Sequence, residues 1–217
     1  MSNVTIVVLG KYEEVFSGFR ETADKHLRNY QKIFVRDGSQ IPDPGNGWQV
    51  VQGPETFSMA GNANLGLKAA PSNSDVLYVG DDVRFMAHDS VEMLRLAAYS
   101  DPKIGILSPV IQGNACNPLQ TNPHLPHLTY TDRTLAFICV YFKRAMMDAI
   151  GFLDEEFNEY GFDDDDYCRR AMQAGWKLAV TPAVTIVHWE GFGSTFKRNP
   201  VWPVAKNADY YRRKWGA

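Results

Sequence analysis

Residues 75–82 read Asp75-Val76-Leu77-Tyr78-Val79-Gly80-Asp81-Asp82, an apolar run that ends in two adjacent carboxylates. A continuous apolar run of this kind is typical of a strand buried on both faces of a parallel sheet. Open α/β sheets bind their ligands beyond the carboxyl ends of their strands. The stretch therefore predicts an α/β fold and places Asp81 and Asp82 at the ligand-binding edge.

The N-terminal segment shows the same pattern and adds a helix. Val4–Leu9 is a continuous run rich in β-branched residues, and residues from about Val15 to His26 have helical periodicity. Gln31–Arg36 predicts another strand, which ends at the turn sequence Asp37-Gly38-Ser39. The order strand, helix, strand indicates parallel strands joined by a right-handed crossover, so Asp37 should lie at the same edge as Asp81 and Asp82.

The rest of the chain continues this alternation. We expect further strands at Trp48–Val51, Leu135–Phe142 and Trp176–Val187, and helices at Gly61–Ala70, Ala145–Ile150 and Asp164–Ala174. Residues Gln112–Asp132 carry three prolines and no period, which predicts a loop on the acceptor side of a site. The sequence thus predicts a single α/β domain over residues 1–217, with a mainly parallel central sheet flanked by helices.

Composition and charge exclude several classes of partner. The chain has 217 residues, 45% of them hydrophobic, and a net charge of −3, so it lacks the basic balance that non-specific nucleic-acid binding needs. The apolar run Val4–Leu9 is too short for a signal-peptide core or a membrane span. We expect a soluble protein that makes at most a peripheral membrane contact. The charge does not favour a nucleic-acid partner, although a modified nucleobase in DNA stays open as an alternative acceptor.

The cysteines indicate a reducing compartment. Cys116, Cys139 and Cys168 are odd in number, widely spaced and without a CxxC pair. This pattern favours neither a disulfide framework nor a structural zinc site. A cytoplasmic location is the expectation.

Asp81 and Asp82 predict a cation site. Adjacent carboxylates repel each other unless they are solvated or neutralised, and a divalent cation neutralises them. Hard cations such as Mg²⁺ or Mn²⁺ take carboxylate oxygens together with substrate phosphate oxygens. The acidic edge therefore indicates a cation bound together with a diphosphate, the alternative being that the two residues only open a loop.

A second acidic cluster lies near the start of the helix predicted at Asp164–Ala174. Asp154-Glu155-Glu156 precedes it, and the run Asp163-Asp164-Asp165-Asp166 opens it. Helix capping and the helix dipole explain one or two acids, each worth about 0.3–1 kcal/mol, but not four. A calcium loop starting at Asp154 would need glycine where the chain has Glu159. A catalytic base is the better interpretation.

His188 follows the apolar run Ala183–Val187 at the end of a predicted strand. An imidazole there could ligate a cation held by aspartates of a neighbouring strand, or could serve as a hydrogen-bonded structural residue. The residues alone leave both alternatives open.

Taken together, the chain resembles the family 2 glycosyltransferases of GT-A fold. The stretches that carry the resemblance follow one another in the family's order: Val4–Leu9, Val35–Ser39, Phe57–Gly66, Val76–Val83 and, most specifically, Gly151–Phe157 through Gly175–Leu178 to His188. The resemblance implies an inverting, metal-dependent hexosyltransferase that uses a nucleotide-sugar, with a UDP-sugar preferred. Its acceptor would be a glycan or a lipid-linked sugar, and its cofactor Mn²⁺ or Mg²⁺.

The resemblance also implies roles for single residues. Asp37 would lie beside the nucleotide base, and Asn64 would support the nucleotide pocket. Asp81 and Asp82 occupy the place of the DxD-type motif and are both candidate metal ligands, Asp82 before Asp81, which would lie nearer the ribose. His188 would complete the metal site. Residues 1–83 would form the nucleotide-binding half and residues 84–217 the acceptor and catalytic half.

Within the four aspartates, the resemblance implies that Asp164 is the base, with Asp163 or Asp165 as alternatives because the run allows a shift of one residue. The family commonly has Glu at the position of Asp163. The motif Gly80-Asp81-Asp82-Val83 lacks a third acid, so fewer protein ligands for the metal are expected. The tail Tyr210–Trp215 would fold over the diphosphate or acceptor, or else form an amphipathic or membrane-surface helix.

Two other classes of protein share some of these features. A nucleotidyltransferase that makes nucleotide-sugars would have a glycine-rich basic loop after the first strand, and Gly10-Lys11-Tyr12-Glu13-Glu14 is a poor version of that loop. A sugar-binding module without catalysis would explain the aromatic residues but not the run of carboxylates. Loss of transfer with retained nucleotide binding in Asp164→Asn would separate an enzyme from such a module.

Overall fold

The computed structural model describes residues 3–37, 41–45, 47–54, 56–189 and 204–216. Its strands are β1 (Asn3–Gly10), β2 (Gln31–Arg36), β3 (Trp48–Gln52), β4 (Ser74–Gly80), β5 (Val83–Arg84), β6 (Ile104–Gln112), β7 (Thr129–Thr131), β8 (Cys139–Phe142) and β9 (Lys177–His188). Its helices are α1 (Glu13–His26), α2 (Met59–Ala69), α3 (Ser90–Tyr99), α4 (Arg144–Ile150), α5 (Asp163–Gln173) and α7 (Val204–Trp215). Gly38 and Ser39 of the predicted turn lie outside the described residues.

The described strands form one sheet in the order β3-β2-β1-β4-β8-β6-β9-β5, and β7 pairs with β9. The strands β3, β2, β1 and β4 run parallel, as the alternation of strands and helices predicts. β8 is antiparallel to both β4 and β6, whereas β6 and β9 are parallel. The α/β fold with a central sheet is confirmed, and the sheet is mixed beyond β4.

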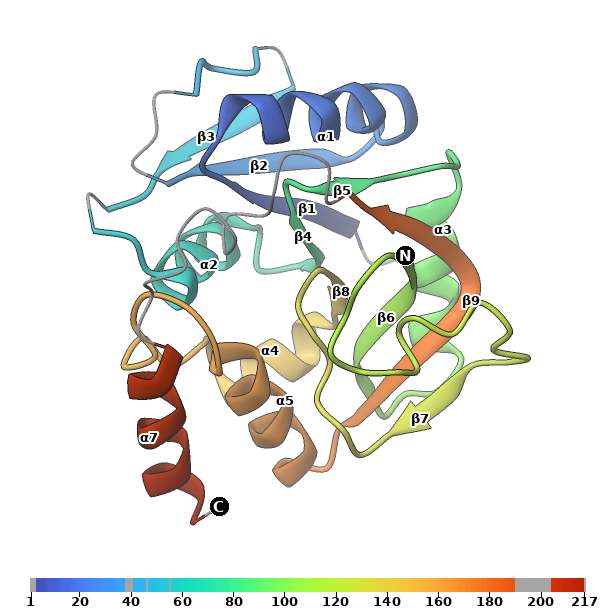
Figure 1. The fold of residues 1–217 in the computed structure, drawn as a ribbon. Helices are drawn as coiled ribbons and strands as arrows, with labels where there is room; N and C mark the ends of the chain where they lie inside the picture. Colours follow the sequence, from blue (N-terminus) through green and yellow to red (C-terminus); the bar gives the residue numbers. More distant parts are fainter. Residues whose placement is uncertain (1–2, 38–40, 46, 55, 190–203, 217) are drawn as a thin grey trace.

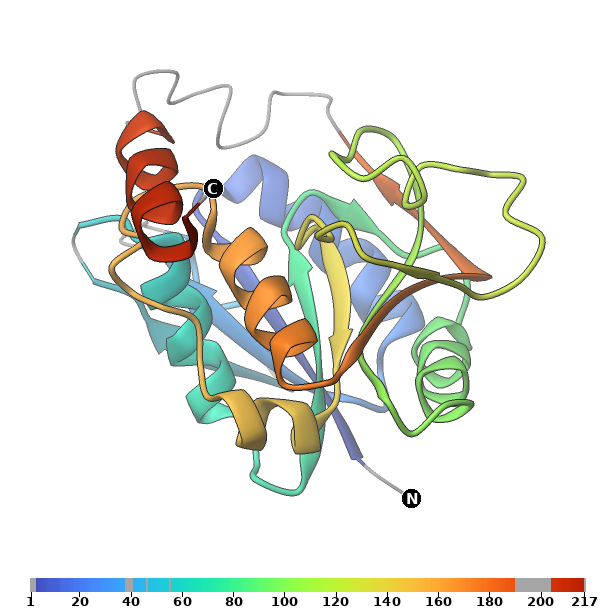
Figure 2. The same cartoon turned by 90° about the horizontal axis from the view of Figure 1, so that it is seen from below.

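Helices cover both faces of the sheet, and each face has its own apolar core (Figures 1 and 2). On one face, Phe16 and Phe19 of α1 and Leu94 of α3 pack with the sheet. On the other face, α2, α4 and α5 contribute residues such as Leu67, Met146 and Tyr167. A strand covered on both faces buries every side chain, which is why the runs of β1 and β4 are continuous rather than alternating.

Helix α2 lies very close to the sheet. A Cβ atom on Gly66 would come within 2.3 Å of a Val7 methyl carbon and 2.9 Å of one on Val35. Only glycine fits at this approach, because any side chain would push the helix away from β1 and β2. Gly66 thereby sets how closely α2 packs on β1 and β2.

Several boundaries differ from the sequence-based expectation. The strand expected from Leu135 begins only at Cys139, because buried Gln120 bonds the backbone N–H and carbonyl of Ala136 in place of a neighbouring strand. In place of the strands expected over Trp176–Val187 there is one long strand, β9 (Lys177–His188), with register irregularities opposite β6. The predicted loop contains the short strand β7, and α3, β5 and β6 were not predicted.

Candidate functional site

Asp37 lies at the carboxyl edge of the sheet, directly after β2, and its carboxylate is almost fully buried. Lys11 Nζ contacts Asp37 Oδ2 at 2.8 Å, and Asn62 Nδ2 donates to Asp37 Oδ1 at 2.9 Å. The Lys11 ammonium also lies 5.1 Å from the centre of the Phe57 ring. The edge thus presents a cation, a carboxylate and an aromatic ring side by side, a set of groups suited to a polar heterocycle.

Asp81 and Asp82 follow β4, but their side chains have different environments. Asp81 is buried, and its Oδ2 accepts a long hydrogen bond of 3.4 Å from the backbone N–H of Lys11. Burial, and then the charge of Asp82, raise the pKa of Asp81 well above its ordinary value. Asp82 instead turns toward β9, where His188 Nε2 lies 3.2 Å from Asp82 Oδ2.

The antiparallel pairing of β5 with β9 brings Asp82 and His188 together. Val83 is in register with His188, and the backbone N–H of Trp189 donates to the carbonyl of Asp82 at 2.7 Å. The two residues are 106 positions apart in the chain. The sequence-based expectation that His188 lies beside the acidic edge agrees with this placement.

The second ring nitrogen of His188 fixes its tautomer. Nδ1 lies 2.8 Å from the carbonyl oxygen of Asn114, and because a carbonyl only accepts, Nδ1 must carry the proton. In the neutral ring, Nε2 then presents a lone pair toward an Asp82 oxygen. Two hydrogen-bond acceptors are stable at this distance only when a cation or an added proton lies between them. Histidines that ligate a metal commonly donate their other ring N–H to a carbonyl, as His188 does here.

These residues fit a divalent cation with few protein ligands. Mn²⁺ is coordinated by imidazole nitrogens and by carboxylate oxygens, and its remaining coordination positions would be filled by water and phosphate oxygens. Over the described ranges, no group of three or more His, Cys, Asp or Glu side chains is arranged to hold a metal. Asp81 accordingly does not join Asp82 and His188 in a ready-made three-residue cage.

The four aspartates that open α5 have four different environments. Asp166 is buried and pairs with Arg170 Nε at 2.8 Å and with Lys214 Nζ at 2.7 Å. Asp165 accepts a hydrogen bond from the Thr134 hydroxyl. Asp163 is buried, and this burial raises its pKa to about 6 despite opposing backbone hydrogen bonds.

Asp164 is the remaining member of the run. It is half-buried, and one oxygen accepts the backbone N–H of Asp165 at 2.9 Å. Burial, and then the charges of Asp163 and Asp165, raise the pKa of Asp164 well above its ordinary value. Within the described part of the chain, no lysine or arginine pairs with Asp164, so its proton affinity is high and its carboxylate is not neutralised by a neighbour.

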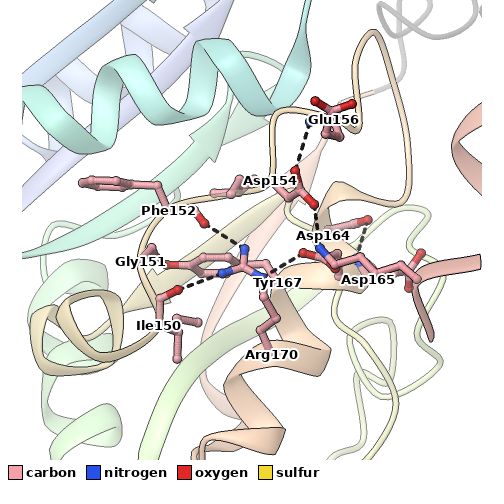
Figure 3. Close-up of polar contacts among 12 residues, drawn as sticks. Ile150, Gly151, Phe152, Asp154, Glu156, Asp164, Asp165, Tyr167 and Arg170 are labelled. Carbon is pink, nitrogen blue, oxygen red and sulfur yellow. Dashed lines mark hydrogen bonds and ion pairs between the residues drawn. The ribbon is translucent and has the colours of Figure 1, made fainter. Parts of the chain in front are cut away.

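Hydrogen bonds from α5 hold the segment that precedes it, which includes Ile150, Gly151 and Phe152. Figure 3 shows Arg170 donating to the carbonyls of Ile150 and Phe152, at 2.9 and 2.8 Å, and Tyr167 bonded to the carbonyl of Gly151. Helix α7 adds a second tie, since Lys214 Nζ contacts Asp154 Oδ2 at 2.6 Å as well as Asp166. A calcium loop starting at Asp154 is not supported, because a lysine already neutralises that carboxylate.

Asn64, which the resemblance implies would support the nucleotide pocket, bonds the segment between α4 and α5. Its Nδ2 donates to the Leu153 carbonyl and to Glu155 Oε1, and its Oδ1 accepts the Leu153 N–H, so the side chain fastens the 151–156 segment to α2. Asn62 is the asparagine that reaches Asp37, and Lys11 joins it. Sequence reasoning missed both residues, although Asn62 and Asn64 lie two positions apart on a helix and therefore cannot face the same way.

The tail forms helix α7, which packs on the loop before α5 rather than standing alone. Tyr210 stacks edge-on against Phe157, with ring centres 4.7 Å apart, and Trp215 Nε1 donates to Asp166 at 3.0 Å. Arg169 lies 4.6 Å from the Trp215 ring centre. The aromatic and cationic residues of the tail are therefore used in packing against the acidic helix.

All three cysteines are free thiols, and burial raises the pKa of Cys139 and Cys168. A search of the described helices finds none with the length and apolarity needed to cross a bilayer.

Comparison with known proteins identifies the fold. No family model and no curated protein sequence matches the chain. Among solved structures, it is similar to GalNAc-T7 crystallised with UDP, GalNAc and Mn²⁺ (TM-score 0.70, 14% identity, covering 98% of this chain and 50% of that one). It is also similar to residues 1–349 of S. aureus TarS (TM-score 0.63, 14% identity, covering 87% and 60%).

These similarities show an α/β domain of the GT-A type, as the sequence predicts. The chain spans about half to three fifths of the length of the two structures. At this level of identity the likeness concerns the fold alone, and membership of family 2 stays a prediction.

Proposed function

We propose that this chain is a metal-dependent glycosyltransferase that moves a sugar, a hexose or its N-acetyl derivative, from a nucleotide-sugar to an acceptor hydroxyl. The observation that carries the proposal is the placement of Asp82 with His188, a pair suited to a cation, at the edge that also holds Asp37. The GT-A type of fold supports it, since the neighbour GalNAc-T7 was crystallised with UDP and Mn²⁺. A UDP-sugar is the preferred donor.

Each residue has a task in this proposal. Asp37, with Lys11 and Asn62 beside it, would bind the nucleotide base of the donor, and Asp81 would lie nearer the ribose. Asp82 and His188 would hold Mn²⁺ or Mg²⁺, which when bound neutralises the diphosphate as it leaves. Residues 1–83 would then bind mainly the nucleotide, and residues 84–217 would supply the catalytic base Asp164 and the cation ligand His188.

Asp164 would act as the general base in a single displacement. Its carboxylate takes the proton of the acceptor hydroxyl while that oxygen forms a bond to the anomeric carbon and the bond to the diphosphate breaks. The configuration at the anomeric carbon is inverted, in line with the resemblance to family 2. The raised pKa of Asp164, caused by burial and then by the charges of Asp163 and Asp165, supports this role, because such a carboxylate binds a proton more tightly than an ordinary aspartate does.

The acceptor would be a glycan or a lipid-linked sugar, approached from the side of the 112–132 segment. The three free thiols support a cytoplasmic site of action. The nucleotidyltransferase alternative would need a basic loop after β1, and Lys11, the basic residue there, is engaged by Asp37.

The test is nucleotide binding by calorimetry and thermal shift, with UDP, GDP, dTDP and CMP, each with and without Mn²⁺. We expect UDP to bind in a Mn²⁺-dependent manner and to raise the melting temperature by mass action. Asp82→Ala should abolish this binding, while Asp89→Ala, which removes an exposed carboxylate at the start of α3, should not. If no nucleotide binds wild type under either condition, the proposal fails.

A further inference from the structure

Helix α5 begins without the contacts that normally start a helix. Its N-cap residue, Phe162, has a left-handed backbone with φ of 67°, and its side chain makes no capping hydrogen bond. Ser58, the N-cap of α2, shows the usual arrangement, since its backbone is extended and its hydroxyl accepts the N–H of Gly61 at 3.0 Å. Contacts from outside α5 must therefore fix where this helix starts.

The segment that leads into α5, residues 158–162, is strained. Glu159 and Phe162 have φ of 62° and 67°, and Gly161 has φ of 95°. Left-handed conformations at non-glycine residues cost free energy, and they persist only where the surrounding structure enforces them. The segment therefore depends on its neighbours, which are α7 and α2 (Figures 1 and 2).

Asn207 of α7 holds the backbone of this segment. Its side chain is almost fully buried, and Nδ2 lies 2.8, 3.2 and 2.9 Å from the carbonyl oxygens of Asn158, Tyr160 and Gly161. Asn207 Oδ1 is also buried and has no hydrogen-bond partner among the described residues. An unpaired buried acceptor destabilises a protein, so Asn207 contributes through its N–H donors, all of which are directed at the strained segment.

Other contacts would keep most of this region in place without Asn207. From α2, the backbone N–H of Met59 donates to the carbonyl of Glu159 at 2.8 Å. The second half of α5 has its own anchor, since Arg170 donates to the carbonyls of Ile150 and Phe152. Loss of the α7 hydrogen bonds should therefore loosen the first turn of α5 and leave the rest of the helix folded.

The first turn of α5 carries Asp164, the candidate base. Asp164 lies two residues after Phe162, and the carbonyl of Phe162 accepts the N–H of Asp166 at 3.0 Å, which closes this turn. The backbone at Phe162 thus sets how the turn is rotated about the helix axis. That rotation sets the direction in which the Asp164 side chain leaves the helix.

We infer that Asn207 is a positioning residue for the catalytic base: by holding residues 158–162, it fixes the first turn of α5 and the place of Asp164 in it. The inference rests on the proposed function. It gives α7, a helix that lies outside the sheet, a role in the reaction.

The test compares Asn207→Ala with wild type at a temperature at which both are folded. The variant loses the donors to the strained segment, so the amide of Asp166 should exchange with deuterium about tenfold faster. The Asp164 carboxyl, followed by carbon NMR and assigned with Asp164→Asn, should titrate closer to an ordinary aspartate, because burial raises its pKa and a loosened turn admits water. Affinity for UDP with Mn²⁺ should be unchanged, since Asp82 and His188 belong to other elements.

Hydrolysis of the donor provides the functional measurement. UDP-glucose, UDP-galactose, UDP-N-acetylglucosamine and UDP-N-acetylgalactosamine are tested with Mn²⁺. In Asn207→Ala, kcat should fall about tenfold and KM should not change, because a misplaced base weakens the transition state and not donor binding. Asn207→Ser keeps one donor and should give intermediate values, so it tests the inference even if the alanine variant does not fold.

Lys206→Ala is the matched control. Lys206 precedes Asn207 on α7, and its Nζ lies 3.3 Å from the side-chain oxygen of Asn158 rather than from a backbone carbonyl. This variant should exchange, titrate and hydrolyse as wild type does. Wild-type exchange and titration in the Asn207 variants, or wild-type kcat, would overturn the inference and leave the proposed function standing. If wild type does not bind UDP, the proposed function itself fails.

Discussion

At the scale of single residues, the acidic start of α5 shows how neighbours of one type acquire different chemistry. Asp166 is neutralised by Arg170 and Lys214, and Asp165 is bonded by Thr134. Asp163 and Asp164 have raised pKa values because burial disfavours their charged forms. Two predictions follow from this difference, one for catalysis and one for stability.

Asp164→Asn should lower the rate of sugar transfer by about 10²- to 10⁴-fold, because the acceptor proton loses its base. UDP binding should stay unchanged, since the amide keeps the shape of the side chain. Asp165→Asn is the matched control and should cost less than about tenfold. Equal losses in the two variants, measured as kcat/KM, would contradict the assignment of the base to Asp164.

Asp163→Asn should stabilise the protein at neutral pH and not at low pH. The pKa of Asp163 is raised from 3.8 to about 6, so the folded state gains stability from binding this proton below pH 4 and loses it as the pH rises through about 6. Removing the charge should then raise the free energy of unfolding at pH 7.5 by on the order of 1–3 kcal/mol. Thermal unfolding at pH 4 and 7.5 measures this, and an equal effect at both values would refute it.

At the scale of elements, α7 and α5 are joined through buried charge. Lys214 of α7 contacts both Asp154 and Asp166, and Trp215 and Tyr210 of the same helix bond these two carboxylates as well. The helix that the sequence identifies as a cationic aromatic tail is thereby part of the support for the candidate base. Its position depends on carboxylates about fifty to sixty positions earlier in the chain.

Lys214→Ala should lower the free energy of unfolding by about 1–3 kcal/mol, because the buried Asp166 loses one of its cations while Arg170 remains. Arg213→Ala removes an adjacent, exposed charge from the same helix and should change stability by less than about 0.5 kcal/mol. Denaturant titrations of the two variants provide the comparison. A similar small loss in both would show that the Lys214 contacts contribute no stability.

At the scale of the whole molecule, the continuous sheet joins the two proposed halves. β4 of the first half pairs with β8 of the second, and β5, at the boundary, pairs with β9. Both apolar cores include residues from each side of position 83. The proposed nucleotide-binding residues and the proposed catalytic base would therefore belong to one folding unit.

We expect unfolding in guanidinium chloride to be a single transition. Far-UV circular dichroism and tryptophan fluorescence should report the same midpoint, because the sheet cannot lose one half without exposing the core of the other. Two separated midpoints would indicate that residues 1–83 and 84–217 unfold independently.

The sequence by itself determined the parallel strands β1 to β4 and the placement of Asp37, Asp81 and Asp82 at one edge. These features are local, since an apolar run defines a strand and the residue after it lies at the strand's end. The helix predicted from Asp164, which begins at Asp163 in the structure, followed from the same kind of signal.

Only the tertiary structure decided which of these residues meet. Asp82 faces His188 because β5 and β9 pair in one register, and Asn62 rather than Asn64 reaches Asp37 because of the rotation of α2 about its axis. Asp164 differs from Asp166 because Lys214 and Arg170 neutralise only the latter. The physical reason is that strand pairing, helix rotation and charge neutralisation depend on partners distant in the chain, whereas sequence patterns report what lies within one element.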